Sequence, residues 1–209
     1  MRNRSLTVLP ALAAALTLTG CTVAPAPAPG KPAPALPADS VAYDKLPTVT
    51  TRPALFAGTC DQFVRHPDLV KDFAAIQQPV TDTSTRSCIV PIADNGFLVL
   101  QQPKQEEGHE NPWVEAWLGE SGITDHLRRE VLLDRYYAVT TVSSNGCQIT
   151  VNTGSPLPFT LDLGYQYRHS SDDSVAGHRA MADKYCPTVR KLAGDYLTAV
   201  DPGGGSLGR

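Results

Sequence analysis

The five cysteines are the residues of this sequence whose types and positions point most directly to chemistry. The first, Cys21, follows Leu18-Thr19-Gly20, and this stretch looks like a bacterial lipobox. In such a motif the thiol accepts a diacylglyceryl group as a thioether, and cleavage before the cysteine frees its amine for a further acyl chain. Two acyl chains hold a protein at a membrane firmly, whereas one holds it weakly. We therefore expect Cys21 to be lipidated; the alternative is an ordinary secretory signal that happens to contain a cysteine.

The other four cysteines favour two disulfides; they are Cys60, Cys88, Cys147 and Cys186. An exported protein meets an oxidising compartment, and an even number of thiols remains once Cys21 carries lipid. Structural zinc is the alternative, but its ligands are closely spaced, and these cysteines lie tens of residues apart with no Cys-x-x-Cys pair. We expect no metal and no cofactor. Three pairings of the four cysteines stay open.

No arrangement typical of catalysis is found in the sequence. It contains no His-Glu-x-x-His pair, and its Gly-x-Ser-x-Gly match at residues 204–208 lies in the glycine-rich tail, where no predicted strand precedes the serine as a nucleophile elbow requires. The adjacent acids Glu106-Glu107 and Asp172-Asp173 lack the alternating oxygen ligands of a calcium loop, so we interpret them as solvated. The histidines are scattered, and we interpret them as surface residues rather than metal ligands: His66, His109, His126, His169 and His178.

Both tryptophans of the chain, Trp113 and Trp117, lie four residues apart in one short segment. Tryptophan is favoured at binding hot spots, so the pair is a candidate ligand site. In that interpretation Trp113 and Trp117 line a groove with Tyr136, Tyr137 and Tyr165, which would hold an apolar or sugar-like ligand. The competing interpretation, which we favour, is that both tryptophans face the core beneath a short helix.

Composition divides the chain into four parts. Residues 1–20 combine Arg2 and Arg4 with a short apolar run, which is typical of a secretory signal and too short to span a bilayer. Residues 21–53 begin with the lipidated cysteine and are rich in proline and alanine, which predicts an extended tether. Residues 54–201 are long enough for one folded domain, and residues 202–209 are glycine-rich and predicted to be disordered.

Net charge limits the partners. The chain is 42% hydrophobic with a formal net charge of −3, and loss of residues 1–20 leaves 16 basic against 21 acidic residues, or −5. A core can therefore form, and a bulk basic surface for nucleic acid is excluded. Attachment to a membrane would rest on acyl chains rather than on a polybasic patch.

Periodicity within the domain predicts an α+β fold. Residues 60–76, with Pro67 inside, indicate one kinked or two short helices, and Asn111-Pro112 is typical of a helix start. Residues 124–133 are predicted to be helical, and residues 174–200 to form a long helix that Pro187 bends. Alternating runs predict strands over 88–92, 97–100, 136–142, 147–151 and 159–167. The expected architecture is an antiparallel sheet of about five strands, with an N-terminal helix and the long C-terminal helix packed on it.

With this order of elements, the chain resembles a known family. It is similar to the actinobacterial lipoproteins of domain-of-unknown-function family 3558. The similarity lies in the lipobox, the tether, Thr59-Cys60-Asp61-Gln62-Phe63 at a helix start, Ser87-Cys88 and Gly146-Cys147 on strands, and Tyr185-Cys186-Pro187 in the last helix. The resemblance implies a small α+β envelope domain, similar to the extracellular sensor domains of some receptor kinases. It carries no activity, cofactor or catalytic residue. It does imply a pairing of Cys60 with Cys88 and of Cys147 with Cys186, each joining a helix to a strand.

We therefore expect a non-enzymatic, membrane-tethered, extracytoplasmic domain that binds an unidentified ligand or protein of the cell envelope as a sensor, carrier or accessory subunit. The alternative is an envelope hydrolase or transferase whose active site is dispersed along the sequence. A concave cluster of His126, Glu115 and Asp134 would distinguish the enzyme. A third interpretation is a purely structural or inhibitory partner, which would present a large exposed apolar patch.

Overall fold

The computed structural model describes residues 51–103, 111–119, 127–143, 146–165 and 174–207, with the backbone alone for Ser143 and Tyr165. The predicted signal segment, Cys21 and nearly all of the predicted tether lie outside these ranges. So do the acidic pairs Glu106-Glu107 and Asp172-Asp173, and the histidines at 109, 126 and 169. No helix within the described ranges is long and apolar enough to cross a membrane.

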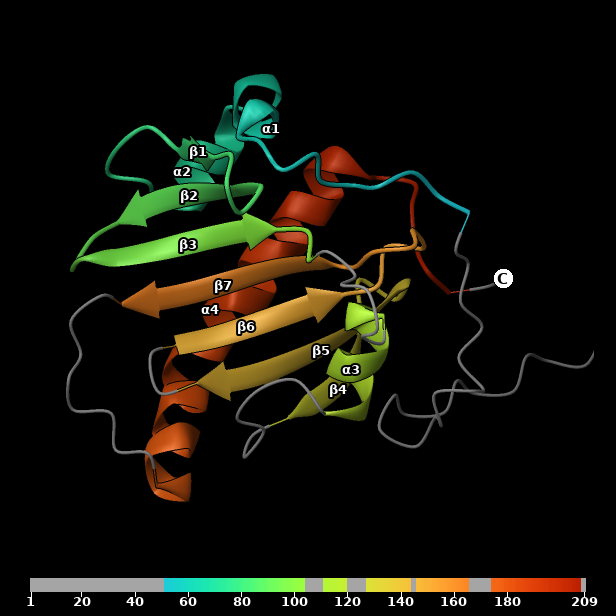
Figure 1. Ribbon diagram of the computed structural model, residues 1–209. Helices are drawn as coiled ribbons and strands as arrows, with labels where there is room; N and C mark the ends of the chain where they lie inside the picture. Colours follow the sequence, from blue (N-terminus) through green and yellow to red (C-terminus); the bar gives the residue numbers. More distant parts are fainter. Residues whose placement is uncertain (1–50, 104–110, 120–126, 144–145, 166–173, 208–209) are drawn as a thin grey trace, which may run out of the picture. The chain divides into compact units, whose positions relative to one another are not determined.

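The fold is α+β and is built on one seven-stranded antiparallel sheet of order β1-β2-β3-β7-β6-β5-β4 (Figure 1). The strands are β1 (Val80–Asp82), β2 (Ser87–Ile92), β3 (Gly96–Gln101), β4 (Arg128–Leu132), β5 (Tyr136–Ser143), β6 (Gly146–Val151) and β7 (Phe159–Tyr165). The five strands predicted from alternation correspond to β2, β3, β5, β6 and β7. The structure adds β1 and β4 at the two edges, since β1 has only three residues and shows no alternation of its own.

The prediction of a helix over residues 124–133 is wrong. Arg128–Leu132 forms β4, which pairs with β5 so that Leu132 lies opposite Tyr136. The chain reverses through Leu133 and Asp134, both with positive φ, at 53° and 56°. Val131 and Leu132 sit on opposite faces of this strand, and both faces have apolar neighbours. Pairing with a long strand and burial on both sides therefore outweigh a local sequence that is compatible with helix.

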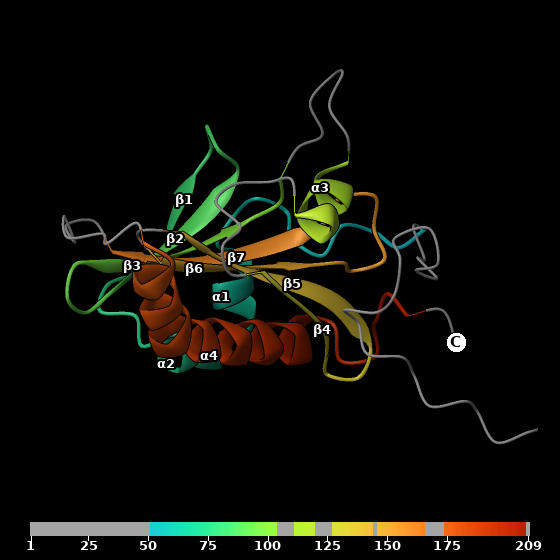
Figure 2. The same ribbon diagram turned by 90° about the horizontal axis from the view of Figure 1, so that it is seen from below.

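Four helices complete the fold. The segment around Pro67 forms two short helices, α1 (Asp61–Arg65) and α2 (Asp68–Asp72). In α3 (Pro112–Leu118) the Asn111 side chain accepts a hydrogen bond from the Trp113 amide at 2.9 Å, and Gly119 ends the helix in the left-handed conformation. The long helix α4 (Val175–Val200) begins after Ser174 and contains Pro187, as predicted, and Figure 2 shows it changing direction along its length.

The main hydrophobic core lies between the sheet and three of these helices. Figure 2 shows α1, α2 and α4 on one side of the sheet and α3 on the other. The inward face of the sheet is closed by α4, where Phe159 stacks on Tyr196 with ring centroids 4.7 Å apart. A second cluster beneath α3 joins Trp113 and Trp117 to Tyr137 and Val139. The two faces of the sheet are therefore covered very differently.

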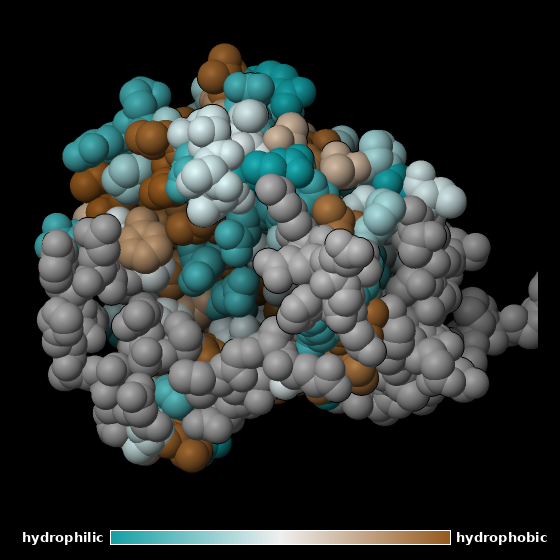
Figure 3. Space-filling model, viewed as in Figure 1, coloured by the Kyte–Doolittle hydropathy of each residue, from teal (hydrophilic) through white to brown (hydrophobic). Residues whose placement is uncertain are grey.

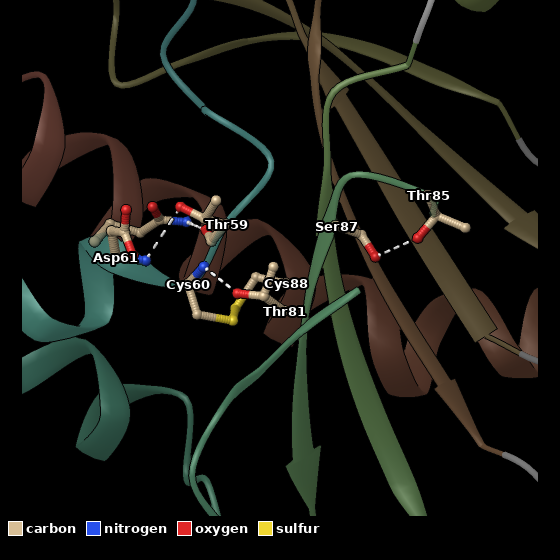
Figure 4. Close-up of a disulfide and its surroundings, with 8 residues drawn as sticks. Thr59, Cys60, Asp61, Thr81, Thr85, Ser87 and Cys88 are labelled. Atoms are coloured by element: carbon tan, nitrogen blue, oxygen red, sulfur yellow. Dashed lines mark hydrogen bonds between the residues drawn. A yellow bond between two sulfur atoms is a disulfide. The ribbon is translucent and has the colours of Figure 1, made fainter. Parts of the chain in front are cut away.

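Two disulfides tie helices to the inward face of the sheet. Cys60, directly before α1, is bonded to Cys88 of β2, and Cys147 of β6 is bonded to Cys186 of α4. The first bond is shown in Figure 4, where the Cys60 amide also donates to Thr81 Oγ1 of β1 at 3.0 Å. Both disulfides predicted from the cysteine count are formed, with the pairing that the family resemblance implies. Each is expected to stabilise the fold by about 2–4 kcal/mol.

The C-terminal segment packs on the domain, which corrects the prediction of a disordered tail over 202–209 for the residues up to 207. Ser206 is fully buried; its amide donates to the Arg135 carbonyl at 2.8 Å, and its hydroxyl accepts from the Tyr137 amide at 3.0 Å. Nearby, the Arg52 guanidinium lies 2.6 Å from the Asp201 carboxylate. These contacts give the glycine-rich segment partners that its composition does not reveal.

Candidate functional site

The two faces of the sheet carry different side chains because successive residues of a strand point to opposite sides. Inward positions of the central strands are fully buried and apolar, as at Leu98, Ile149 and Leu161. On the other face, Figure 2 shows the β1–β2 hairpin rising at one side and α3 at the other, with the sheet as the floor between them. The space-filling view in Figure 3 shows this face hollowed near its middle, and we call the region the outer trough, defined by six outward-facing residues: Ile89, Phe97, Val99, Gln101, Asp162 and Gln148.

One row of cross-strand partners runs through the outer trough. Asp162 of β7 lies opposite Val99 of β3 on one side and opposite Gln148 of β6 on the other. The row continues to Ile89 of β2 beyond Val99, and to Thr141 of β5 beyond Gln148. Figure 3 views this face and shows hydrophilic residues in the hollow near its middle, with hydrophobic residues gathered over β2 and β3. The row is therefore apolar at one end, polar at the other and acidic at its centre.

Asp162 is the carboxyl group at that centre, and it is partly buried. Burial raises the pKa of Asp162 from 3.8 to about 6, because a desolvated carboxylate is less stable than a hydrated one. Within the described ranges, no side chain donates a hydrogen bond to it and no cation pairs with it. An uncompensated carboxylate on a sheet face lowers the stability of the fold, and residues of this kind concentrate at functional sites.

The Phe97 ring lies beside Asp162 on the same face. Phe97 of β3 is the cross-strand partner of Gly164, which is two residues from Asp162 on β7. A Cβ atom built on Gly164 would lie only 2.6 Å from Cζ of Phe97. Glycine at 164 therefore allows the ring to lie across the backbone of β7, next to the carboxyl group.

The nearest neighbours of Asp162 on the outer face are uncharged. They are Val99, Phe97 and Gln101 of β3, Gln148 and Thr150 of β6, and Thr160 of β7. Charged groups come only towards the edges of this face within the part that the structure describes. Asp82 of β1 is held by Ser84 and Thr85, whose hydrogen bonds lower its pKa, and Arg129 of β4 donates to the Trp117 carbonyl at 2.7 Å.

The residues predicted to line an aromatic groove do not come together as one surface. Trp113, Trp117 and Tyr137 are at most 7% exposed and pack on one another, with Trp117 in edge contact with Tyr137 at 5.6 Å. The Tyr136 side chain lies on the opposite face of β5, where its hydroxyl donates to the Asp201 carboxylate at 2.8 Å. The Tyr165 side chain lies outside the described residues. Adjacent residues of a strand alternate in direction, so Tyr136 and Tyr137 cannot share a groove.

Two cavities lie on the α4 side of the domain. The larger, of about 400 Å³, is between α2 and the C-terminal half of α4, and the smaller, of about 160 Å³, is between α4 and strands β4 and β5. One charged group at each cavity has a charged partner. Asp195 accepts from Lys191 at 2.6 Å beside the larger cavity, and Arg190 forms an ion pair with Glu130 at the smaller one.

Of the cluster predicted for a dispersed active site, only Glu115 and Asp134 lie within the described residues. Glu115 lies in α3 and Asp134 in the β4–β5 turn, and no hydrogen bond or ion pair joins them. His126 falls outside the described ranges. The described histidines, cysteines and carboxylates include no group of three that could hold a metal ion.

Sequence reasoning did not single out Asp162, although a signal was present. Phe159, Leu161, Leu163 and Tyr165 alternate and predict one buried face, which leaves Thr160, Asp162 and Gly164 on the other. What the sequence does not reveal is which strands flank β7. Because β3 and β6 contribute Val99 and Gln148, neither flanking strand places a counter-ion beside the carboxyl group.

No family model matches this chain, and neither the curated proteins nor the solved structures include a match. What the outer trough binds must therefore be inferred from its own residues.

Proposed function

We propose that this chain is a lipid-anchored, extracytoplasmic binding domain of the bacterial cell envelope, which acts by holding a ligand or partner in the outer trough rather than by catalysis. The observation that carries the proposal is Asp162. Among the described residues its carboxyl group has no charged neighbour at the centre of the outer face, where an uncharged side chain would make the fold more stable. Natural sequences give up stability in this way where a site needs it.

The two faces of the sheet differ in packing, which supports a structural role for the inward face and a binding role for the outward one. The inward face is filled by α4 and by both disulfides, since Cys88 and Cys147 are inward positions that are fully buried. The outward residues of the central row, such as Val99, Asp162 and Gln148, are only partly buried. A rigid, covalently tied scaffold with one partly open face is the arrangement expected of a binding module.

The start of the folded domain is consistent with a tether before it. Arg52, at the end of the predicted tether, donates from its amide to the Gly154 carbonyl at 2.9 Å, and its side chain pairs with Asp201. The hydrogen bond to Asp201 raises the pKa of the Arg52 guanidinium, so this pair stays charged at physiological pH. A proline-rich segment of about thirty residues before it would reach on the order of 90 Å when extended.

Membership of the family 3558 lipoproteins is part of the same proposal. It rests on the lipobox, on the tether and on the order of the four domain cysteines. The formation of the implied Cys60–Cys88 and Cys147–Cys186 pairs supports it.

Anchoring is tested by feeding producing bacteria a labelled fatty acid and isolating the full chain. The wild type and the neighbouring control Thr22→Ala should carry label, and Cys21→Ala should carry none. Label retained by Cys21→Ala, or no label on the wild type, would rule out a lipid anchor at this residue.

Binding in the outer trough is tested by blocking it. Gln148→Trp places a large ring beside Asp162, and Thr188→Trp places the same ring on an exposed position of α4 as the control. The full chain is extracted from membranes in mild detergent, and its native mass is compared with its denatured mass. We expect an added mass that denaturation releases in the wild type and in Thr188→Trp, and its loss in Gln148→Trp. A bare wild-type chain, or a ligand retained by Gln148→Trp, would contradict the proposal.

A further inference from the structure

The centre of the outer trough combines a negative group, an aromatic face and an apolar row. Asp162 supplies the carboxylate, and the Phe97 ring lies over Gly164 two residues along the same strand. On the side of Asp162 towards β2, Val99 and Ile89 continue the row as apolar side chains. None of these residues has a charged partner among the described side chains.

We propose that Asp162 and Phe97 together recognise an organic ammonium ion, whose apolar portion lies along Val99 and Ile89. This inference rests on the proposed function of the outer trough and names the class of ligand.

Charge complementarity selects a cation as the occupant. A carboxylate in a partly desolvated site is stabilised strongly by an opposite charge within hydrogen-bond distance, and the described residues around it supply none. The face of a phenyl ring attracts ammonium groups through its quadrupole. The negative net charge of the chain also raises the local concentration of cations.

The composition of the row selects an ammonium ion that carries an apolar group. A hydrated inorganic cation would leave Ile89 and Val99 uncovered, and it would gain nothing from contact with them. An alkyl or ring substituent buries this surface, with about 25 cal/mol gained per Å² of apolar area removed from water. On the other side of Asp162, Gln148 offers an oxygen atom to a remaining N–H donor of the ammonium group.

Binding of a cation here is linked to protons. Asp162 has a pKa of about 6, so the carboxylate is mostly ionised at pH 7.5 and mostly protonated at pH 5. The side chains that face it from β3 and β6 do not titrate in this range, because they are Val99, Phe97, Gln101, Gln148 and Thr150. The titratable or charged groups on the bordering elements are Asp82 of β1, Glu115 of α3, Tyr137 of β5 and Arg129 of β4. Asp82 has its pKa lowered and Tyr137 has its pKa raised, so neither changes charge between pH 5 and 7.5.

The test uses the full chain and n-butylammonium, with n-butanol and butyrate as matched probes, in titration calorimetry. The variants are Asp162→Asn and, as the control, Asp134→Asn in the exposed β4–β5 turn. We expect the wild type and Asp134→Asn to bind butylammonium at least tenfold more tightly than either matched probe. The Asp162→Asn substitution should weaken butylammonium binding at least tenfold. Lowering the pH from 7.5 to 5 should weaken butylammonium binding by the wild type about tenfold, because a carboxyl group with a pKa near 6 is then about 90% protonated. The same change of pH should not affect butylammonium binding by Asp162→Asn.

A second variant, Phe97→Leu, keeps an apolar side chain of similar reach and removes the ring. This variant should bind butylammonium about threefold more weakly than the wild type and should bind butanol equally well. Equal binding of butanol and butylammonium, or equal binding by Asp162→Asn and the wild type, would overturn the inference. So would the absence of butylammonium binding at the highest soluble concentration.

Failure of this inference is distinguishable from failure of the proposed function. If Gln148→Trp removes the native ligand but Asp162→Asn retains it, the outer trough is a binding site for a ligand without a recognised cation. If Gln148→Trp has no effect on the native ligand, the outer trough is not the binding site at all.

Discussion

The inward and outward faces of the same sheet differ in how tightly they are packed, and we assign stability to the first and propose recognition for the second. On the inward face, neighbouring positions such as Leu98, Leu161 and Ile149 are fully buried beneath α4, and every one of them is apolar. On the outward face, the row of cross-strand partners changes from apolar at Ile89 to acidic at Asp162 and to polar and uncharged at Gln148. The strands supply the same backbone to both faces, so the difference comes entirely from what each face packs against.

That difference is instructive because the cost of a side chain depends on its surroundings. A carboxyl group at an inward position needs a partner, as Glu130 of β4 shows, because it is buried there and forms an ion pair with Arg190 of α4. At Asp162 the desolvation is only partial, so the carboxyl group is retained with a raised pKa. The outer trough is thus the place where this fold keeps a carboxyl group that has no charged partner among the described residues.

The largest expected effect is on core packing, and neighbouring residues of β3 provide the comparison. Leu98→Ala, inward and fully buried, should lower the free energy of unfolding by about 3–5 kcal/mol. Val99→Ala, outward and partly buried, should lower it by about 1 kcal/mol or less. Chemical denaturation of the full chain measures both. Equal losses would mean that the outer face is as tightly packed as the core.

The next effect concerns the covalent bond between α4 and the sheet. Replacing Cys147 and Cys186 together by Ser opens a loop with a sequence separation of 39 residues, which should lower the free energy of unfolding by about 2–4 kcal/mol. The bond lies on the inward face, so butylammonium binding in the outer trough should persist under conditions where this variant is still folded. Loss of binding in a folded double variant would show that the two faces are coupled.

The smallest expected effect has the opposite sign. The pKa of Asp162 is raised in the folded state, so its contribution to stability is fully present below pH 3.8 and is lost as the pH rises through about 6. Asp162→Asn stays neutral and should raise the free energy of unfolding by about 2–3 kcal/mol at pH 7.5, with little change at pH 4. Denaturation at the two pH values measures this. A variant less stable than the wild type at pH 7.5 would mean that the carboxylate has a stabilising partner.

Local signals predicted the elements that depend on few neighbours. Alternation located β2, β3, β5, β6 and β7, and the Asn111-Pro112 start located α3, because strand alternation and helix caps are written in adjacent residues. The helix expected over 124–133 failed because β4 exists only through its pairing with β5. The tail expected to be disordered failed for a similar reason, since Ser206 is held by Arg135 and Tyr137 from a distant strand.

The candidate site was less accessible to sequence reasoning. Aromatic residues drew attention to Trp113 and Trp117, but rarity and size do not distinguish a buried cluster from a binding surface. Asp162 stands in an ordinary alternating strand, whose pattern places it on the outward face but does not reveal its neighbours there. Its significance comes from Val99 and Gln148, which are 63 and 14 residues away and lie beside it only in the sheet.

The sequence alone determined the α+β class, most of the strands, the long last helix and the presence of two disulfides, because periodicity and cysteine count are properties of the chain itself. Tertiary structure decided the edge strands, the docking of the C-terminal segment and the surroundings of Asp162. These depend on which distant segments become neighbours, and desolvation and charge pairing act between neighbours in space rather than along the chain.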